Sequence, residues 1–173
     1  MKHQILQHCQ LALVLLLCPL FSIAQDNGSI DTDRPDQTES AFLVPKHYFQ
    51  TEWGFYFEQL SDAETHWQYP AALWKYGLSD RFELRLITEI DRFKAGGSFV
   101  SGLSPVAVGF KTKLWEQQNW LPTTSLIAHV KFPKLASKGL TGRYVAPEFR
   151  FTCNNNITKR FGVGYNFGME WDT

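Results

Sequence analysis

Residues 161–171, F-G-V-G-Y-N-F-G-M-E-W, constrain the fold more than any other stretch of this chain. Large apolar side chains occupy every second position from Phe161 to Trp171, and glycine, asparagine or glutamate fills the positions between them. Successive side chains of a strand point to opposite faces, so a strand here has one apolar face and one small or polar face. This pattern is typical of a transmembrane β-barrel strand, which needs about 9–11 residues with an apolar side toward lipid.

The same alternation recurs in six earlier segments. The expected strands are 48–58, 69–77, 82–91, 104–115, 122–132 and 144–153, followed by 161–171 as the seventh. Pro70 lacks an N–H donor for the ladder, so we expect it at the start of its strand. Long connections at 59–68, 92–103 and 133–143 alternate with short ones, as the external loops and periplasmic turns of outer-membrane barrels do. The sequence therefore predicts an all-β fold, an antiparallel up-and-down transmembrane β-barrel with about seven strands present.

Charged side chains fall opposite the large apolar ones on strand after strand. A soluble sandwich shows the same alternation with its faces reversed, but here tryptophan and tyrosine gather near strand ends, as in the interfacial belts of membrane proteins. We therefore expect the charged face to line a lumen, with ion pairs between its members. The expected lumen-lining residues are Glu52, Glu83, Arg85, Glu89, Lys111, Lys113, His129, Lys131, Glu148, Arg150 and Glu170.

The N-terminus has the features of a secretory signal peptide. Lys2 supplies a basic start, residues 11–20 form an apolar core, and Ser22 and Ala24 are small residues at the positions that define a cleavage site. We expect cleavage after Ala24 and a location in the outer membrane of a Gram-negative bacterium, with its lipid as a partner. The expected organisation is a signal peptide at 1–24, a periplasmic lead-in or barrel-mouth segment at 25–46, and a partial outer-membrane β-barrel at 47–173.

Composition and motifs favour neither a nucleic-acid partner nor an enzyme. The chain has 17 basic and 17 acidic residues, without the basic stripe of a nucleic-acid-binding protein. Ser125 and His129 lie about 13 Å apart along one strand face, too far for a catalytic pair. The acidic residues of 31–39 lack the glycine and glutamate of a calcium loop, and no phosphate loop or zinc spacing is present. We expect no catalytic residue, cofactor or metal.

Four stretches carry a resemblance to a known family. They are T-D-R-P-D-Q-T-E-S at 32–40, Y-G-L-S-D-R-F-E-L-R at 76–85, G-L-S-P-V-A-V-G-F-K at 102–111 and Y-V-A-P-E-F-R-F at 144–151. On these residues the chain resembles the family named for the MetA pathway of phenol degradation, outer-membrane β-barrel proteins of Bacteroidetes-type bacteria. The resemblance implies a barrel with a role in the uptake of hydrophobic or aromatic small molecules. Those barrels are longer, so we expect this sequence to be truncated at its C-terminus or completed by another chain.

Three functions remain open at this point. The leading hypothesis is a channel or transporter that lets small, hydrophobic or aromatic solutes pass through a charged lumen. The second is a structural or adhesive outer-membrane barrel whose lumen is closed by side chains. The third is a soluble periplasmic binding protein of lipocalin type, which would shield residues such as Phe55, Leu84, Phe110 and Phe167 inside.

Overall fold

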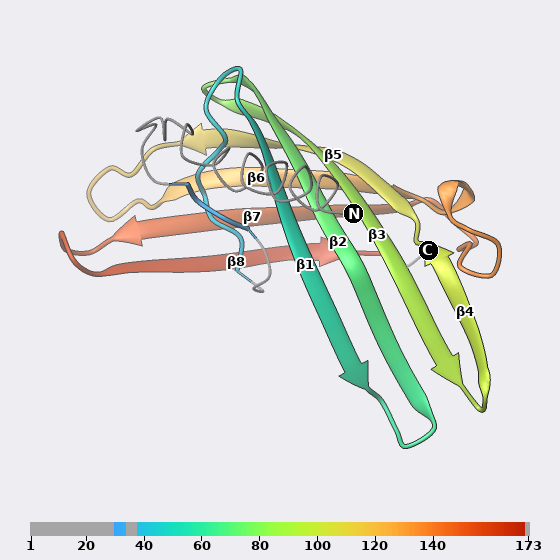
Figure 1. The fold of residues 1–173 in the computed structure, drawn as a ribbon. Helices are drawn as coiled ribbons and strands as arrows, with labels where there is room; N and C mark the ends of the chain where they lie inside the picture. The colour runs from blue at the N-terminus through green and yellow to red at the C-terminus, as the bar shows by residue number, and fades with distance from the viewer. Residues whose placement is uncertain (1–29, 34–37, 172–173) are drawn as a thin grey trace, which may run out of the picture. The chain divides into compact units, whose positions relative to one another are not determined.

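The computed structural model describes residues 30–33 and 38–171 (Figure 1). The expected signal peptide, with its cleavage site at Ala24, lies outside the described residues. The strands and the charged residues of the sheet belong to one compact unit, Asp31–Thr173.

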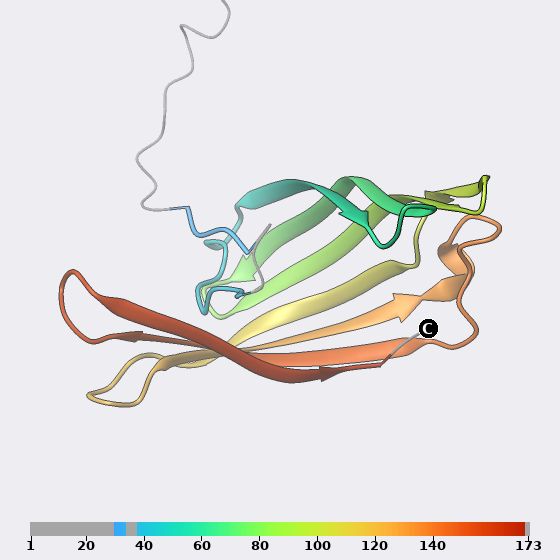
Figure 2. The same cartoon turned by 90° about the horizontal axis from the view of Figure 1, so that it is seen from below.

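Eight antiparallel strands form one sheet that curls into a half-barrel (Figures 1 and 2). Their order in the sheet is β1-β2-β3-β5-β6-β7-β8, and β4 pairs with the end of β3. The strands are β1 Phe49–Gln59, β2 Glu64–Ser79, β3 Phe82–Ala95, β4 Ser98–Leu103, β5 Val106–Trp115, β6 Thr123–Phe132, β7 Ala146–Asn156 and β8 Gly162–Glu170. The prediction of an all-β antiparallel barrel architecture is confirmed, and β4 adds an eighth strand to the seven that were expected.

Two of the predicted long loops are wrong. Residues 59–68 and 92–103 form hairpins, because β2 begins at Glu64 and β3 continues to Ala95 before β4 returns beside it. Gly96 and Gly97, at φ 55° and 87°, make the two-residue turn between β3 and β4, which requires positive φ at both positions. At these strand ends polar and apolar side chains occur on both faces, with Phe93 on one face and Phe99 beside Lys94 on the other, so hydrophobic alternation stops there while backbone pairing continues.

The prediction for Pro70 is also wrong, since this residue lies inside β2 and not at its start. The pairing of β2 with β3 shifts register between Gln68 and Ala71, so the proline sits at an irregularity in the ladder. A missing N–H is tolerated at such a point, because one ladder hydrogen bond is already absent there.

The polarity of the two sheet faces is opposite to that of a soluble domain. Phe55, Leu84 and Phe167 on the outer face are 79%, 45% and 58% exposed, whereas charged side chains such as Glu83, Lys111 and Arg85 are almost fully buried on the concave face. This distribution argues against the lipocalin-like alternative, which places the apolar side chains inside.

Among the described residues, no helix is both long enough and apolar enough to cross a membrane.

Gly109 permits a close approach between β5 and β6. A Cβ atom at this position would lie 2.1 Å from the carbonyl oxygen of Ala128 and 2.3 Å from the His129 ring. We predict that Gly109→Ala lowers the free energy of unfolding by about 1–3 kcal/mol, because backbone must move to admit the methyl group. Urea unfolding of the detergent-solubilised protein, followed by tryptophan fluorescence, measures the change.

Gly54→Ala is the matched control for this prediction. Its nearest contact would be 3.8 Å, an ordinary van der Waals distance, so the change expected is within about 0.5 kcal/mol. Equal midpoints for the two variants would contradict the proposed close packing of β5 on β6.

Candidate functional site

The segment before β1 lies on the concave side of the sheet (Figure 2, blue). The backbone N–H of Asp33 donates to Glu52 at 2.8 Å, and that of Val44 donates to Glu83 at 2.7 Å. From the opposite side, the Ser125 hydroxyl donates to the carbonyl oxygen of Ala41 at 2.6 Å. Ala41 is fully buried. The described residues 31–33 and 38–45, called the inner segment below, are thus tied to strands β1, β3 and β6.

Close backbone packing holds the end of the inner segment. A Cβ on Gly77 of β2 would meet the carbonyl oxygen of Pro45 at 2.1 Å and that of Val44 at 2.5 Å. The N–H of His47 donates to the Gly77 carbonyl at 2.7 Å, and the N–H of Gly77 donates to Tyr48 at 3.0 Å. Only glycine leaves room for this contact, so β2 is built to receive the segment.

Asp33 lies at the centre of a buried cluster of cations. Its carboxylate is 2.9 Å from Nη1 of Arg85, 3.3 Å from Nζ of Lys75 and 3.4 Å from Nζ of Lys111. These cations come from β3, β2 and β5, and none of the four side chains is more than 3% exposed. One carboxylate of the inner segment therefore links three strands of the sheet.

The surroundings of Asp33 fix its charge. Burial by itself would raise the pKa of the Asp33 carboxyl, but Lys111, Arg85 and Lys75 together hold this pKa well below its ordinary range. The backbone N–H of Ser40, which donates to the carboxylate at 2.9 Å, acts in the same direction. Asp33 is consequently ionised at physiological pH.

Further carboxylates balance the remaining positive charge of this cluster. Glu52 is paired with Lys75. Arg85 also contacts Glu83 at 3.4 Å and Glu39 of the inner segment at 3.1 Å. Ion pairs buried to this degree need several hydrogen-bonded partners to offset the loss of hydration, and here each cation has at least one carboxylate in reach.

A second charged cluster follows on β6 and β7. Arg150 contacts Glu148 at 3.1 Å and Glu39 at 3.5 Å, and Nδ1 of His129 is 3.6 Å from Glu148. Asn166 of β8, with its amide oriented to satisfy both atoms, donates to the Glu39 carbonyl oxygen at 3.0 Å and accepts from its N–H at 2.6 Å. Glu39 therefore connects the inner segment to both clusters and to β8.

A polar cavity of about 280 Å³ adjoins the inner segment on the concave face. Both ring nitrogens of the buried His129 lack a hydrogen-bond partner among the described residues. Nδ1 faces the Glu148 carboxylate at 3.6 Å, beyond hydrogen-bond distance, whereas Nε2 has no such neighbour among the described residues. Charged residues that line the cavity include Glu89, His129, Lys131, Glu148, Arg150 and Glu170.

The structure places the predicted lumen residues in three settings. Glu52, Glu83, Arg85 and Lys111 belong to the cluster around Asp33, and His129, Glu148 and Arg150 form the second cluster. Lys131 pairs with Glu170, and both line the cavity with Glu89. Lys113 is the exception, because it pairs at 3.1 Å with Glu116 beyond the end of β5.

Sequence reasoning missed three residues of the central cluster, namely Asp33, Glu39 and Lys75. Lys75 is the direct partner of Arg85 on β3, so its side chain points to the same concave face. The alternation along β2 alone would have been enough to predict this direction. Asp33 and Glu39 lie in a motif that has no strand alternation. The only sequence signal for them is the concentration of acidic residues at 32–40.

A further group that the sequence did not predict lies near the start of β2. Nε2 of His66 is 2.8 Å from Asp91, and the Ser104 hydroxyl donates to the other oxygen of the same carboxylate. The carboxylate stands between histidine and serine, so the serine has no adjacent base as a catalytic triad requires. Within the described residues, no group of three or more histidine, cysteine or acidic side chains is arranged to hold a metal.

A comparison with family models matches residues 32–173 to the family described as "Putative MetA-pathway of phenol degradation". The chain belongs to this family. The match begins at residue 32, so all eight strands and the inner segment from residue 32 onward lie within the matched range. The resemblance expected from the sequence is confirmed. Searches of curated proteins and of solved structures gave no match.

We predict that Asp33→Asn lowers the free energy of unfolding by about 3–5 kcal/mol, because three buried cations lose their common counter-charge. Urea unfolding in detergent measures the effect. The control is Glu116→Gln, which breaks the exposed pair with Lys113 and is expected to change stability by less than about 0.5 kcal/mol. A loss for Asp33→Asn no larger than that of the control would contradict the central role of Asp33.

The depressed pKa of Asp33 predicts a pH dependence. A carboxyl whose pKa is lower in the folded state stabilises the fold fully above its unfolded pKa of about 4, and the contribution is lost as pH falls through the folded pKa. The advantage of the wild type over Asp33→Asn should therefore be constant above pH 4 and shrink below it. Unfolding midpoints of both proteins across this range test the sign, and a constant difference down to strong acid contradicts it.

Proposed function

We propose that the chain forms part of the wall of an outer-membrane β-barrel that lets small solutes cross the membrane. The proposal includes a cleaved signal peptide at 1–24, lipid around the outer face and a solute in the lumen. Hydrophobic and aromatic compounds are the candidate solutes, because the family is named for phenol degradation. We propose no enzymatic reaction for the chain.

The observation that carries the proposal is the polarity of the half-barrel. Its outer face exposes large apolar side chains on β1 to β6 and on β8, Phe149 and Phe151 of β7 are half-buried, and its concave face buries ionised side chains. Water solvates the outer face of such a sheet poorly, whereas lipid covers it favourably. The charged concave face is suited to an aqueous path.

In this proposal the inner segment narrows the path. It is bound to β1, β3 and β6 by hydrogen bonds and to three cations through Asp33, and the polar cavity lies beside it. Solutes would pass through the cavity and meet the side chains of His129, Arg150 and Glu170. The side chains of Arg150 and Glu170, which are 28% and 44% exposed, would offer hydrogen bonds to a hydroxylated solute such as a phenol.

A closed structural barrel is the second candidate. The density of ion pairs on the concave face favours it, since Lys75, Arg85 and Lys111 are all buried and paired. Small barrels fill their interiors with side chains and conduct nothing. The two candidates share a location and differ only in whether the lumen conducts.

Cell fractionation and gel migration test the shared location. We expect the full-length gene product in the outer-membrane fraction, with faster gel migration before boiling than after it, as folded membrane barrels show. A periplasmic protein whose migration does not change on boiling would overturn both candidates. Single-channel conductance in a planar lipid bilayer then separates a channel from a closed barrel.

We predict that Gly77→Val raises the conductance of this channel. The valine side chain would collide with the carbonyls of Pro45 and Val44 and dislodge the inner segment from β2. Gly164→Ala, which meets nothing closer than 3.7 Å and lies outside the lining of the polar cavity, is the control and should conduct as the wild type does. Heat-modifiable migration verifies that each variant is folded. A folded Gly77→Val protein with unchanged conductance would show that the inner segment does not restrict the path.

A further inference from the structure

The outer face carries a row of aromatic rings that ends at basic side chains. Phe57 of β1 is the direct partner of Trp67 of β2, and Trp67 is the direct partner of Arg92 of β3. The ring centroids of Phe57 and Trp67 are 4.3 Å apart, and the Arg92 guanidinium lies 4.9 Å from the centre of the Phe99 ring on β4. These four side chains cross one end of the sheet at nearly the same level.

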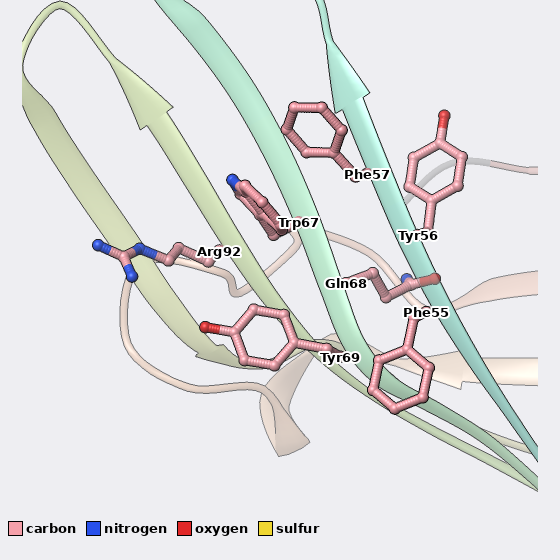
Figure 3. A pocket seen from close by; sticks show the side chains of 7 residues that line it. All are labelled: Phe55, Tyr56, Phe57, Trp67, Gln68, Tyr69 and Arg92. Carbon is pink, nitrogen blue, oxygen red and sulfur yellow. The ribbon is translucent and has the colours of Figure 1, made fainter.

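A cavity of about 410 Å³ opens between these side chains (Figure 3). Five aromatic side chains from β1 and β2 line the cavity, together with Gln68 of β2 and with Arg92 of β3, which lies beside Trp67. The aromatic residues are Phe55, Tyr56, Phe57, Trp67 and Tyr69. Its volume lies in the range of small-ligand sites, and its walls are mostly aromatic with a cation at one side. The chemistry matches a molecule that has an apolar part and an anionic part.

The charge pattern places this cation at the edge of the apolar band. The outward positions of β3 run from Leu84 and Leu86 through Ile90 to Arg92 and Lys94. Among the described residues no carboxylate pairs with Arg92 or Lys94, whereas the buried cations of the concave face are paired. The strand register places the nearby acidic residues Glu58 and Glu64 on the concave face, away from Arg92 and Lys94.

We propose that this site binds an anionic phospholipid, with the lipid phosphate on Arg92 and Lys94 and an acyl chain along the aromatic row. A guanidinium offers a fork of donors that matches phosphate oxygens, and tryptophan and tyrosine settle at the level of lipid head groups. The proposal rests on the proposed membrane location. It adds a specific lipid contact on the outer face that the passage of solute through the lumen does not require.

Native mass spectrometry of the detergent-purified full chain tests the site, with phosphatidic acid and phosphatidylcholine as probes. The wild type should bind phosphatidic acid in preference to phosphatidylcholine. Arg92→Gln should bind phosphatidic acid about tenfold more weakly and lose the preference, since a charge-assisted hydrogen bond is removed. Trp67→Leu should weaken the binding of both lipids, because the aromatic wall serves the acyl chain.

The matched control is Arg143→Gln. Arg143 also lies over an aromatic ring, 5.3 Å from the centre of Tyr144, but on an exposed loop outside the aromatic cavity. Equal binding of phosphatidic acid by Arg92→Gln and Arg143→Gln would overturn the proposal.

Displacement of phosphatidic acid by inorganic phosphate would also overturn it, because that result would identify a site for free phosphate. Lipid binding without conductance would refute only the channel, and conductance without lipid preference would refute only this site.

Discussion

The carboxylate of Asp33 balances three lysine and arginine side chains that the curvature of the sheet brings together. Without it, cations from β2, β3 and β5 would face one another in a region from which water is largely excluded, and their repulsion would oppose the curl. The inner segment depends equally on the sheet, because Ala41 and Val44 are the apolar residues that it buries and its other ties to the strands are polar. Electrostatic pairing on the concave face thus replaces the hydrophobic core that organises a soluble β-domain, and it makes the segment a part of the fold.

The period-two alternation was enough to predict the fold class, because strand geometry ties sequence parity to direction, but the prediction did not place charged residues such as Lys75 and Arg92 of the longer strands. The ends of β2 and β3 were missed for a physical reason. At those ends polar and apolar side chains share each face, such as His66 beside Phe93 on one and Trp67 beside Arg92 on the other, so alternation gives no signal although backbone pairing continues. Asp33 was missed for another reason. Its partners are 42, 52 and 78 residues away along the chain, and only the closed register of three strands brings them within ion-pair distance.

Glu39 gives the two charged clusters a common member. It contacts Arg85 in the cluster around Asp33 and Arg150 in the cluster beside the cavity, and its backbone meets Asn166 of β8. A solute that competes for Arg150 would therefore act on a residue that also holds the inner segment. In the proposed transport function, this single side chain would couple the binding of a solute to the position of the inner segment.

The long sequence separations around Asp33 also have a consequence for how the protein assembles. Contacts between residues far apart in the chain form slowly, since a long loop must close before they yield any stabilisation. Asp33 can reach its complete set of cations only after β5 has taken its place beside β3. The part of the structured chain that is synthesised first is therefore among the last to reach its native contacts, and until then Lys111 lacks the carboxylate with which it pairs in the native structure.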